Sequence, residues 1–552
     1  MTNAIFTIMK RFTTLILIAI LAMACTKRKN VDLIVTNAKI YSVDSAFSVY
    51  ESMAIDKGKI VALLNNSDIN REYESKTVLD ANGKYIYPGF IDPHCHFLGY
   101  GLGLPNAWLA DAKNWEEVVN RLIENQKQYA TEWVKGRGWN QNEWSIKQFP
   151  TNDLLNKAFP NKPVYIVRID GHAAIANQKA LELAGINNKT TVNGGEIVKI
   201  NGKPTGVLID NAMELVRKCI PESTKEEKSK ALINAQKNCF AVGLTSIHDA
   251  GLDTDEVILI DSLQKAGSLK MRINAMLNPT PSNYKTFICK GVYQTDRLTV
   301  RSIKIYADGA LGSRGALLLE PYSDDPKNKG IQVEPAEKLD SICKMANDAG
   351  YQVCTHCIGD AAVRLMIDIY SKYLDENNDT RWRIEHSQVV DPQDLPRYAK
   401  YHIIPSVQTT HATSDMDWAD ERLGSRIKYA YAYQDLLQQN GWLPNGSDFP
   451  IEQVNPLYGF YSGVTRQHFN GEPKDGFQME NALTREQALR AMTIWAAKSC
   501  FEENTKGSIG VGKVADFVLL DFDLMNDSTQ NIPNVKVLQT YVNGEKVFDI
   551  NN

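Results

Sequence analysis

The chain has 552 residues, of which 43% are hydrophobic and 23% are charged, and its formal net charge is -4. This length exceeds one simple domain and predicts either a large barrel with additions or two to three domains. The sequence pI of about 6.2 lacks the basic excess typical of nucleic-acid-binding proteins, so no nucleic-acid partner is expected. Composition leaves the oligomeric state open.

The first residues form a segment typical of export. Lys10 and Arg11 precede an apolar run, Leu15–Met23, which leads into Ala24-Cys25. A basic start, a short apolar run and small residues before a cleavage point predict a signal peptide over 1–24, because the run is too short for a membrane-spanning helix. Cys25 stands where a bacterial lipoprotein carries its lipid. We therefore expect an exported lipoprotein, periplasmic or anchored at the outer membrane, with cleavage without lipidation as the alternative.

Strand-like segments lie near both ends of the chain. Residues 32–60 alternate between apolar and polar types, as half-buried strands do. Residues 514–521 and 535–548 repeat this alternation, and Asn543-Gly544 predicts a hairpin turn. The two ends are expected to pair into one small β-sandwich, made from residues 25–87 and 501–552.

Strand and helix patterns alternate through the middle of the chain, which predicts parallel βαβ units. The eight candidate strands are residues 87–91, 244–248, 272–277, 302–307, 352–356, 382–386, 403–407 and 441–444. Eight such units close into an α/β fold, the (β/α)8 barrel, expected over residues 88–500. A doubly wound open sheet is the alternative. The stretch after the first strand is too long for a loop, so about 104–221 is interpreted as an insertion near the active-site mouth.

Polar residues follow several of these predicted strands. His94 and His96 are two apart in an extended segment, so both imidazoles face the same side. The fourth, fifth, sixth and eighth strands contribute Lys304, His356, His386 and Asp448. Each residue alone has a structural explanation, such as a hydrogen-bonded core histidine or a helix cap. Together they lie at the face of a barrel where active sites are found, and they predict a metal centre.

The segments around these residues resemble the amidohydrolase superfamily, and within it the amidohydrolase 3, YtcJ-like branch. The resemblance rests on PGFIDPHCH (88–96), KIYADGALGSRG (304–315), HCIGD (356–360), RIEHSQ (383–388) and GSDFP (446–450). It covers roughly residues 30–550. It implies a metal-holding barrel together with a β-sandwich made from both chain ends.

The resemblance also implies one or two divalent metal ions. Their ligands would be His94, His96, His356, His386 and Asp448. Lys304 occupies the place of a lysine that is often carbamylated and bridges two metals. Because an ammonium group cannot bind a cation, Lys304 is either carbamylated in a two-metal site or free in a one-metal site, where it could pair with Asp308. Zinc suits this histidine-rich set, although iron or manganese would also fit.

The expected activity is hydrolysis of a non-peptide C–N bond, in an amide, an N-acyl group or a cyclic amide of a small molecule. A bound metal would activate water and polarise the substrate carbonyl. Asp448 would take the proton of the attacking water and pass it to the leaving nitrogen. A non-catalytic metal- or ligand-binding lipoprotein on the same barrel is the alternative. A metal-dependent isomerase or ester hydrolase is a third possibility.

Four further residues have looser assignments. His172, in the insertion, is predicted to contact substrate, with a structural histidine at a helix start as the alternative. Arg314 is a candidate for binding a substrate carboxylate, because a guanidinium matches that shape, and a surface salt bridge is its alternative. His411, after the seventh strand, faces the predicted mouth. His248 ends the second strand and either supports the site or fills the core.

Overall fold

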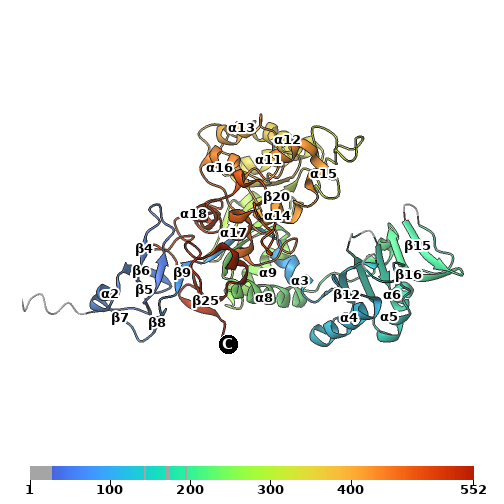
Figure 1. Ribbon diagram of the computed structural model, residues 1–552, viewed down its shortest axis with the longest axis horizontal. Coiled ribbons are helices and arrows are strands. Elements are labelled where there is room, and N and C mark those ends of the chain that lie inside the picture. Colours follow the sequence, from blue (N-terminus) through green and yellow to red (C-terminus); the bar gives the residue numbers. More distant parts are fainter. Residues whose placement is uncertain (1–27, 142–143, 170, 172, 193–194, 552) are drawn as a thin grey trace, which may run out of the picture. The chain divides into compact units, whose positions relative to one another are not determined.

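The computed structural model describes residues 28–551 except 142–143, 170, 172 and 193–194, and it divides into two units (Figure 1). The first contains the chain up to Phe97 and from Gln236 onward, and the second contains Leu98–Ala235. The predicted signal peptide and Cys25 lie outside the described residues. None of the described helices has both the length and the apolar character required to cross a membrane.

A curved parallel sheet forms the centre of the first unit. In order across the sheet, its strands are β10 (Phe90–Cys95), β17 (Leu244–Leu252), β18 (Arg272–Leu277), β20 (Leu298–Tyr306), β21 (Gln352–Cys357), β22 (Arg383–His386) and β23 (Ile404–Ser406). The short β19 (Tyr293–Gln294) pairs with β20. Most residues of these strands are buried, as expected for parallel strands that are covered on both faces.

The barrel closes through an eighth segment that is not a regular strand. Asn445 forms a single parallel bridge with Val407. On the other side, Asp448 N donates to His94 O at 2.8 Å, and this bond joins the segment to β10. The predicted eighth strand, residues 441–444, is therefore not a regular strand, and the bridge lies at the next residue, Asn445. Pro444 has no N–H to donate to a ladder, which explains the irregularity.

The first barrel strand starts later than predicted. Tyr87, placed in that strand by its apolar neighbours, belongs to β9 (Tyr85–Pro88) of a different sheet. Only Gly89 separates the two strands, and β10 begins at Phe90. One apolar run therefore contributes a strand to each of two sheets. Its periodicity alone does not show where the first strand ends and the second begins.

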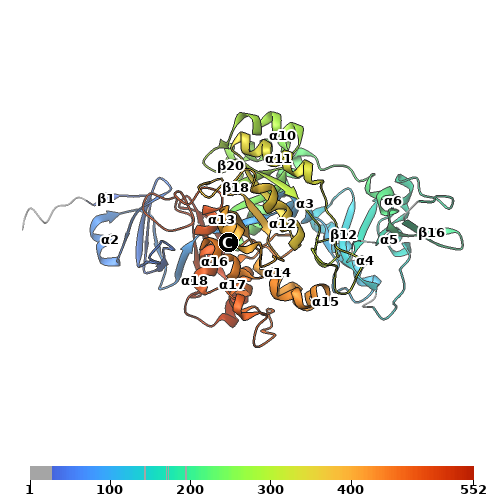
Figure 2. The same cartoon turned by 90° about the horizontal axis from the view of Figure 1, so that it is seen from above.

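Helices alternate with the barrel strands along the chain, and Figure 2 shows several of them around the sheet. The helices of the first unit include α2 (Asn66–Glu72), α9 (Thr254–Lys265), α10 (Pro281–Thr286), α11 (Ala336–Ala349), α12 (Asp360–Tyr370), α13 (Leu395–Lys400), α14 (Thr409–Asp415), α15 (Ala419–Leu423), α16 (Tyr433–Asn440), α17 (Pro456–Thr465), α18 (Arg485–Ala491) and α19 (Ile494–Lys498). In α11, Leu339, Ile342, Cys343 and Ala346 are buried. Their spacing of three and four residues places them on one face of the helix.

The β-sandwich combines both ends of the chain, as the sequence predicts. One sheet contains β6 (Lys59–Leu64), β5 (Ser52–Asp56), β2 (Leu33–Thr36) and β8 (Val78–Asp80). The other contains β26 (Glu545–Asp549), β25 (Val537–Val542), β24 (Phe517–Leu520), β9, β3 (Lys39–Tyr41) and β4 (Val49–Tyr50). The predicted turn at Asn543-Gly544 joins β25 to β26, and both residues have the positive φ angles that a tight hairpin requires.

Substitution of Phe517 would test whether the stability of the sandwich depends on its C-terminal strands. Its ring is fully buried and stacks on Tyr541 with centroids 4.3 Å apart, and the residue pairs in register with Pro88 from the other end of the chain. We expect Phe517→Ala to lower the free energy of unfolding by about 3–5 kcal/mol. Urea unfolding followed by fluorescence would measure the change. Val78→Ala, at an exposed position of the same sandwich, should change the free energy by less than about 0.5 kcal/mol.

The second unit has its own mixed sheet and its own hydrophobic core. Its strands, in order, are β11 (Ala107–Trp108), β12 (Val134–Trp139), β13 (Val164–Arg168), β14 (Ala173–Ala176), β16 (Lys203–Asp210) and β15 (Gly195–Ile200). Its helices include α4 (Trp115–Tyr129), α5 (Asp153–Ala158), α6 (Gln178–Leu183) and α7 (Met213–Arg217). The unit lies between β10 and β17 in the chain and is wider than the predicted 104–221.

Candidate metal centre

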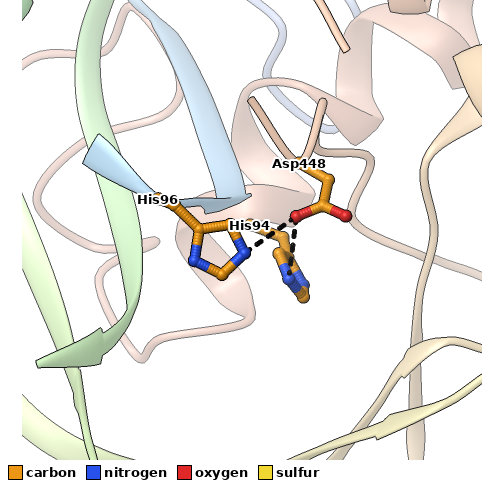
Figure 3. A group of neighbouring side chains, drawn as sticks. All are labelled: His94, His96 and Asp448. Carbon is orange, nitrogen blue, oxygen red and sulfur yellow. Dashed lines mark ion pairs between the residues drawn. The ribbon is translucent and has the colours of Figure 1, made fainter. Parts of the chain in front are cut away.

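His94, His96 and Asp448 meet at the C-terminal end of the barrel (Figure 3). Each offers one ligand atom, and the three atoms lie within 4.8 Å of one another. Asp448 Oδ1 is 3.1 Å from His96 Nε2 and 3.5 Å from His94 Nε2. The two histidines come from β10 and the residue after it, whereas Asp448 follows the eighth segment. Residues about 350 positions apart therefore form one cluster.

The hydrogen bonds of the two imidazoles fix which ring nitrogen faces Asp448. His96 Nδ1 lies 3.1 Å from the carbonyl oxygen of Ala250, which can only accept, so Nδ1 carries the proton. His94 Nδ1 lies 2.5 Å from Glu385 Oε2, which likewise accepts. In a neutral imidazole the other nitrogen, Nε2, is then a lone-pair acceptor. Two such acceptors face the carboxylate of Asp448, and this is a donor set that fits a divalent cation.

Asp92 holds the backbone on both sides of this cluster. Its carboxylate accepts from His94 N at 3.0 Å and from Ser447 Oγ at 2.6 Å. The next residue, Asp448, has a φ of 61°, in the left-handed region that residues other than glycine seldom adopt. Such backbone conformations persist where surrounding bonds enforce them. We did not single out Asp92 from the sequence, although it lies two residues before His94 on the same face of the strand.

His356 and His386 lie beside the first three residues. Their ring centroids are 4.5 Å apart, and the His386 ring is 4.9 Å from that of His94. His386 Nδ1 contacts Gln408 Oε1 at 2.7 Å. His386 also has a φ of 72°, in the left-handed region that residues other than glycine seldom adopt. All five residues predicted as metal ligands from the sequence are therefore neighbours in space.

Lys304 also reaches this cluster but makes a different contact from the one expected of a free lysine. Its buried Nζ donates to His94 Nε2 at 3.0 Å. The pairing with Asp308 that a free Lys304 could make is not formed, because the Asp308 carboxylate accepts from the backbone N–H groups of Leu317, Ile358 and Gly359 at 2.8–3.0 Å. Asp308 therefore holds the loops that follow β20 and β21.

Burial controls the protonation of these groups. Desolvation and the charge of Lys304 lower the pKa of His94 to about 4 and that of His356 to about 3. Burial also lowers the pKa of His386 well below its usual range, and it lowers that of Lys304. These three imidazoles are neutral at pH 7, which is the form that binds metal.

Behind the cluster lies a buried ion pair that we did not predict. Arg383 Nε is 2.6 Å from Glu385 Oε1, and Arg383 Nη2 donates to Glu385 Oε2 at 2.8 Å. Although burial disfavours the charge of Glu385, Arg383 and His94 hold its pKa well below the usual range. The two residues are two positions apart on β22, so they share one face of the strand, and both are fully buried. That spacing in Arg-Ile-Glu-His was the available signal.

His411 and His248 occupy different places around the cluster. The His411 ring stacks on that of His386 with centroids 5.8 Å apart, and its Nε2 is 4.0 Å from Asp448 Oδ2. It therefore lies at the site. His248 is buried, and its Nδ1 accepts from Arg383 Nη1 at 3.1 Å. His248 therefore contacts Arg383 behind the cluster and is not one of the candidate metal ligands.

The two residues predicted to contact substrate are placed differently. Arg314 forms a two-pronged salt bridge with Asp324, at 2.7 and 3.1 Å. This is the surface salt bridge that the sequence analysis gave as the alternative to substrate binding. His172 lies outside the described residues. A role in substrate binding stays a prediction for both.

Comparison with known proteins agrees with this arrangement. Residues 77–548 match the model of the amidohydrolase family. The chain is 34% identical to Protein LONG AFTER FAR-RED 3 of Arabidopsis thaliana, covering 94% of this chain and 91% of that protein. It is 31% identical to the Bacillus subtilis (strain 168) protein named "Putative amidohydrolase YtcJ", covering 90% of this chain and 96% of that protein.

Two further likenesses bear on chemistry and fold. The N-substituted formamide deformylase of Arthrobacter pascens is 25% identical, with 93% of this chain and 97% of that protein covered. The crystal structure of an uncharacterized metal-dependent hydrolase from Pyrococcus horikoshii OT3 superposes with a TM-score of 0.77 at 28% identity, covering 90% of this chain and 99% of that chain. The family model spans most of the sequence, and the chain belongs to the amidohydrolase family.

Proposed function

We propose that the protein is a metal-dependent hydrolase that cleaves a non-peptide C–N bond in a small molecule. The observation that carries this proposal is the meeting of three acceptors, His94 Nε2, His96 Nε2 and an Asp448 oxygen, at the C-terminal end of the barrel. Two imidazole nitrogens and a carboxylate oxygen this close together form a ligand set that suits a divalent cation. Membership in the amidohydrolase family supports the same conclusion.

The residues of the site would divide the work as follows. His94, His96 and Asp448 would hold one divalent ion, and His356 and His386 would complete this centre or a second one. When bound, zinc or a similar ion would polarise the scissile carbonyl and activate water. The Asp448 carboxylate would accept the proton of the attacking water and deliver it to the leaving nitrogen, since one positioned carboxylate can act as base and then as acid.

Lys304 would determine the number of metals. Its ammonium donates to His94 Nε2, the atom that would bind the ion, so this hydrogen bond has to be replaced when metal enters. Carbamylation would replace the positive charge by a carboxylate-like group that accepts rather than donates. We therefore extend the proposal to a carbamylated Lys304 in a two-metal site, with a free Lys304 in a one-metal site as the alternative.

The proposed substrates are amides, N-acyl compounds and cyclic amides. A relative named N-substituted formamide deformylase makes N-formyl amines the first class to examine. We expect the metal-loaded protein to release formate and free amine from at least one such compound, measured by amine detection after incubation with a panel of N-formyl, N-acyl and cyclic amides. Matched esters in the panel would identify an ester hydrolase. Saturable binding without turnover in a metal-loaded sample would favour the non-catalytic alternative.

The proposal extends to the cell envelope. The signal-like segment before Cys25 supports export and lipid attachment at that cysteine. Mass spectrometry of the N-terminal peptide from the native source would show either a diacylated Cys25 or an unmodified mature end. A retained 1–24 segment would contradict export by this route.

A further inference from the structure

We propose that Glu385 and Arg383 are positioning residues that set the tautomer and orientation of His94 for metal binding. The inference rests on the proposed metal-dependent function and assigns a role to two residues of the barrel interior. Neither residue is among the predicted ligands. Both lie on β22, and both are fully buried.

The contact with Glu385 decides which nitrogen of His94 is available. The ring of His94 is fully buried, and its Nδ1 lies 2.5 Å from Glu385 Oε2. An ionised carboxylate only accepts, so Nδ1 keeps its proton and Nε2 presents a lone pair toward Asp448. If this contact were lost, the proton could move to Nε2, and the ring could rotate. Carboxylate partners of this kind orient metal-binding histidines and raise their basicity.

Arg383 in turn fixes Glu385. Its Nη2 donates to Glu385 Oε2 at 2.8 Å, and its Nε lies 2.6 Å from Oε1 as an ion-pair contact, so the guanidinium restricts the orientation of the carboxylate. The same Nη2 also lies 2.7 Å from Pro93 O and 2.9 Å from Ser406 Oγ, and Nη1 donates to His248 Nδ1 at 3.1 Å. These partners lie on β10, β23 and β17. Arg383 therefore ties His94, through the residue before it and through Glu385, to four strands of the barrel.

Stability alone does not account for a charged pair in this position. A barrel interior is ordinarily filled by branched apolar side chains. Replacing a buried ion pair by well-packed apolar residues is often neutral or stabilising, because desolvation offsets the attraction between the charges. The first unit holds another largely buried ion pair, Lys506 with Glu502, whose side chains are 6% and 14% exposed, and Glu502 also accepts from Thr299 Oγ1 at 2.7 Å. That pair has no contact with the predicted ligands, so it provides a matched control.

The experiment compares Glu385→Gln with Glu502→Gln in the full-length protein. Each substitution keeps the side-chain size and removes the negative charge of one ion pair, which is fully buried for Glu385 and largely buried for Glu502. The metal-free forms would be titrated with Co²⁺ in competition with a chromophoric chelator, and their thermal unfolding would be recorded in parallel. We expect Glu385→Gln to weaken Co²⁺ affinity by about 10–100-fold and to change the visible absorption bands of the bound ion. Glu502→Gln should lower the unfolding temperature and leave both the affinity and the spectrum unchanged.

A second variant covers the case in which Glu385→Gln does not fold. Glu385→Asp keeps the charge beside Arg383 but withdraws the carboxylate by one methylene from His94, so Co²⁺ affinity should fall by less than in Glu385→Gln. Wild-type affinity and spectrum in either variant would overturn the positioning role. A wild-type protein that binds no Co²⁺, or that binds it without cleaving any C–N substrate, would instead contradict the proposed function. The two failures are therefore distinguishable.

Discussion

Removal of metal from the purified protein with a chelator is expected to reduce C–N hydrolysis by about 10³-fold or more. The ion would supply several kcal/mol of transition-state stabilisation, and each 1.4 kcal/mol corresponds to a factor of about ten in rate. The described side chains that face the Asp448 carboxylate are imidazoles, which are poor substitutes for a Lewis acid. Activity should return when Zn²⁺, Mn²⁺ or Fe²⁺ is added to the metal-free protein, and the order of recovery identifies the preferred ion.

Two measurements make this result specific. Metal content by mass spectrometry before chelation should give one or two ions per chain, and a value near two would support a carbamylated Lys304. Circular dichroism should show that the metal-free protein retains its secondary structure, because the barrel and the sandwich each have an apolar core. Full activity in a protein shown to contain no metal would refute the proposed mechanism.

Asp448→Asn is expected to lower kcat by about 10²–10⁴-fold, the range associated with loss of a general acid–base group. The amide keeps the shape of the side chain but cannot accept the proton of the attacking water. It is also a weaker ligand, so KM and metal affinity should change as well. Steady-state kinetics at saturating metal would separate the loss of proton transfer from incomplete loading of the site.

The control for this substitution is Asp475→Asn, which changes an exposed carboxylate in the same unit. It should leave kcat, KM and metal content at wild-type values. If Asp448→Asn, fully loaded with metal, were as active as the wild type, another group would have to move the proton. His411, whose Nε2 is 4.0 Å from Asp448 Oδ2, would then be the first residue to substitute.

The site residues that could be predicted from the sequence are those that local sequence patterns mark, through residue type and position relative to a predicted strand. His94 and His96 share a face of an extended segment, and His356, His386 and Asp448 each follow a strand pattern. The barrel brings strand ends together, so their meeting follows from topology. The sandwich was predictable for a similar reason. Strands that alternate apolar and polar residues have one apolar face, and the strands at the two chain ends can bury these faces against each other.

The residues that were missed act through contacts that cross the barrel. Glu385 is defined by a bond to His94, which lies 291 positions away in the chain. Asp92 is defined by bonds to Ser447, 355 positions away. The local spacing places each carboxylate on one face of a strand, but it does not show which distant residue the carboxylate contacts. The break between β9 and β10 was hidden for another reason, because an apolar run carries the same signal whichever sheet it enters.

The pairing of Pro88 with Phe517 has a consequence for how the chain is made. On the ribosome, β9 emerges about 430 residues before β24, so its hydrogen-bonding edge stays without that partner through most of synthesis. Strand pairings between residues far apart in the sequence form slowly. Until such a pairing forms, the unpaired strand edge can associate with other chains. The sandwich is thus the last part of the molecule to be completed, and a ribosome that stops early leaves the N-terminal sheet unfinished.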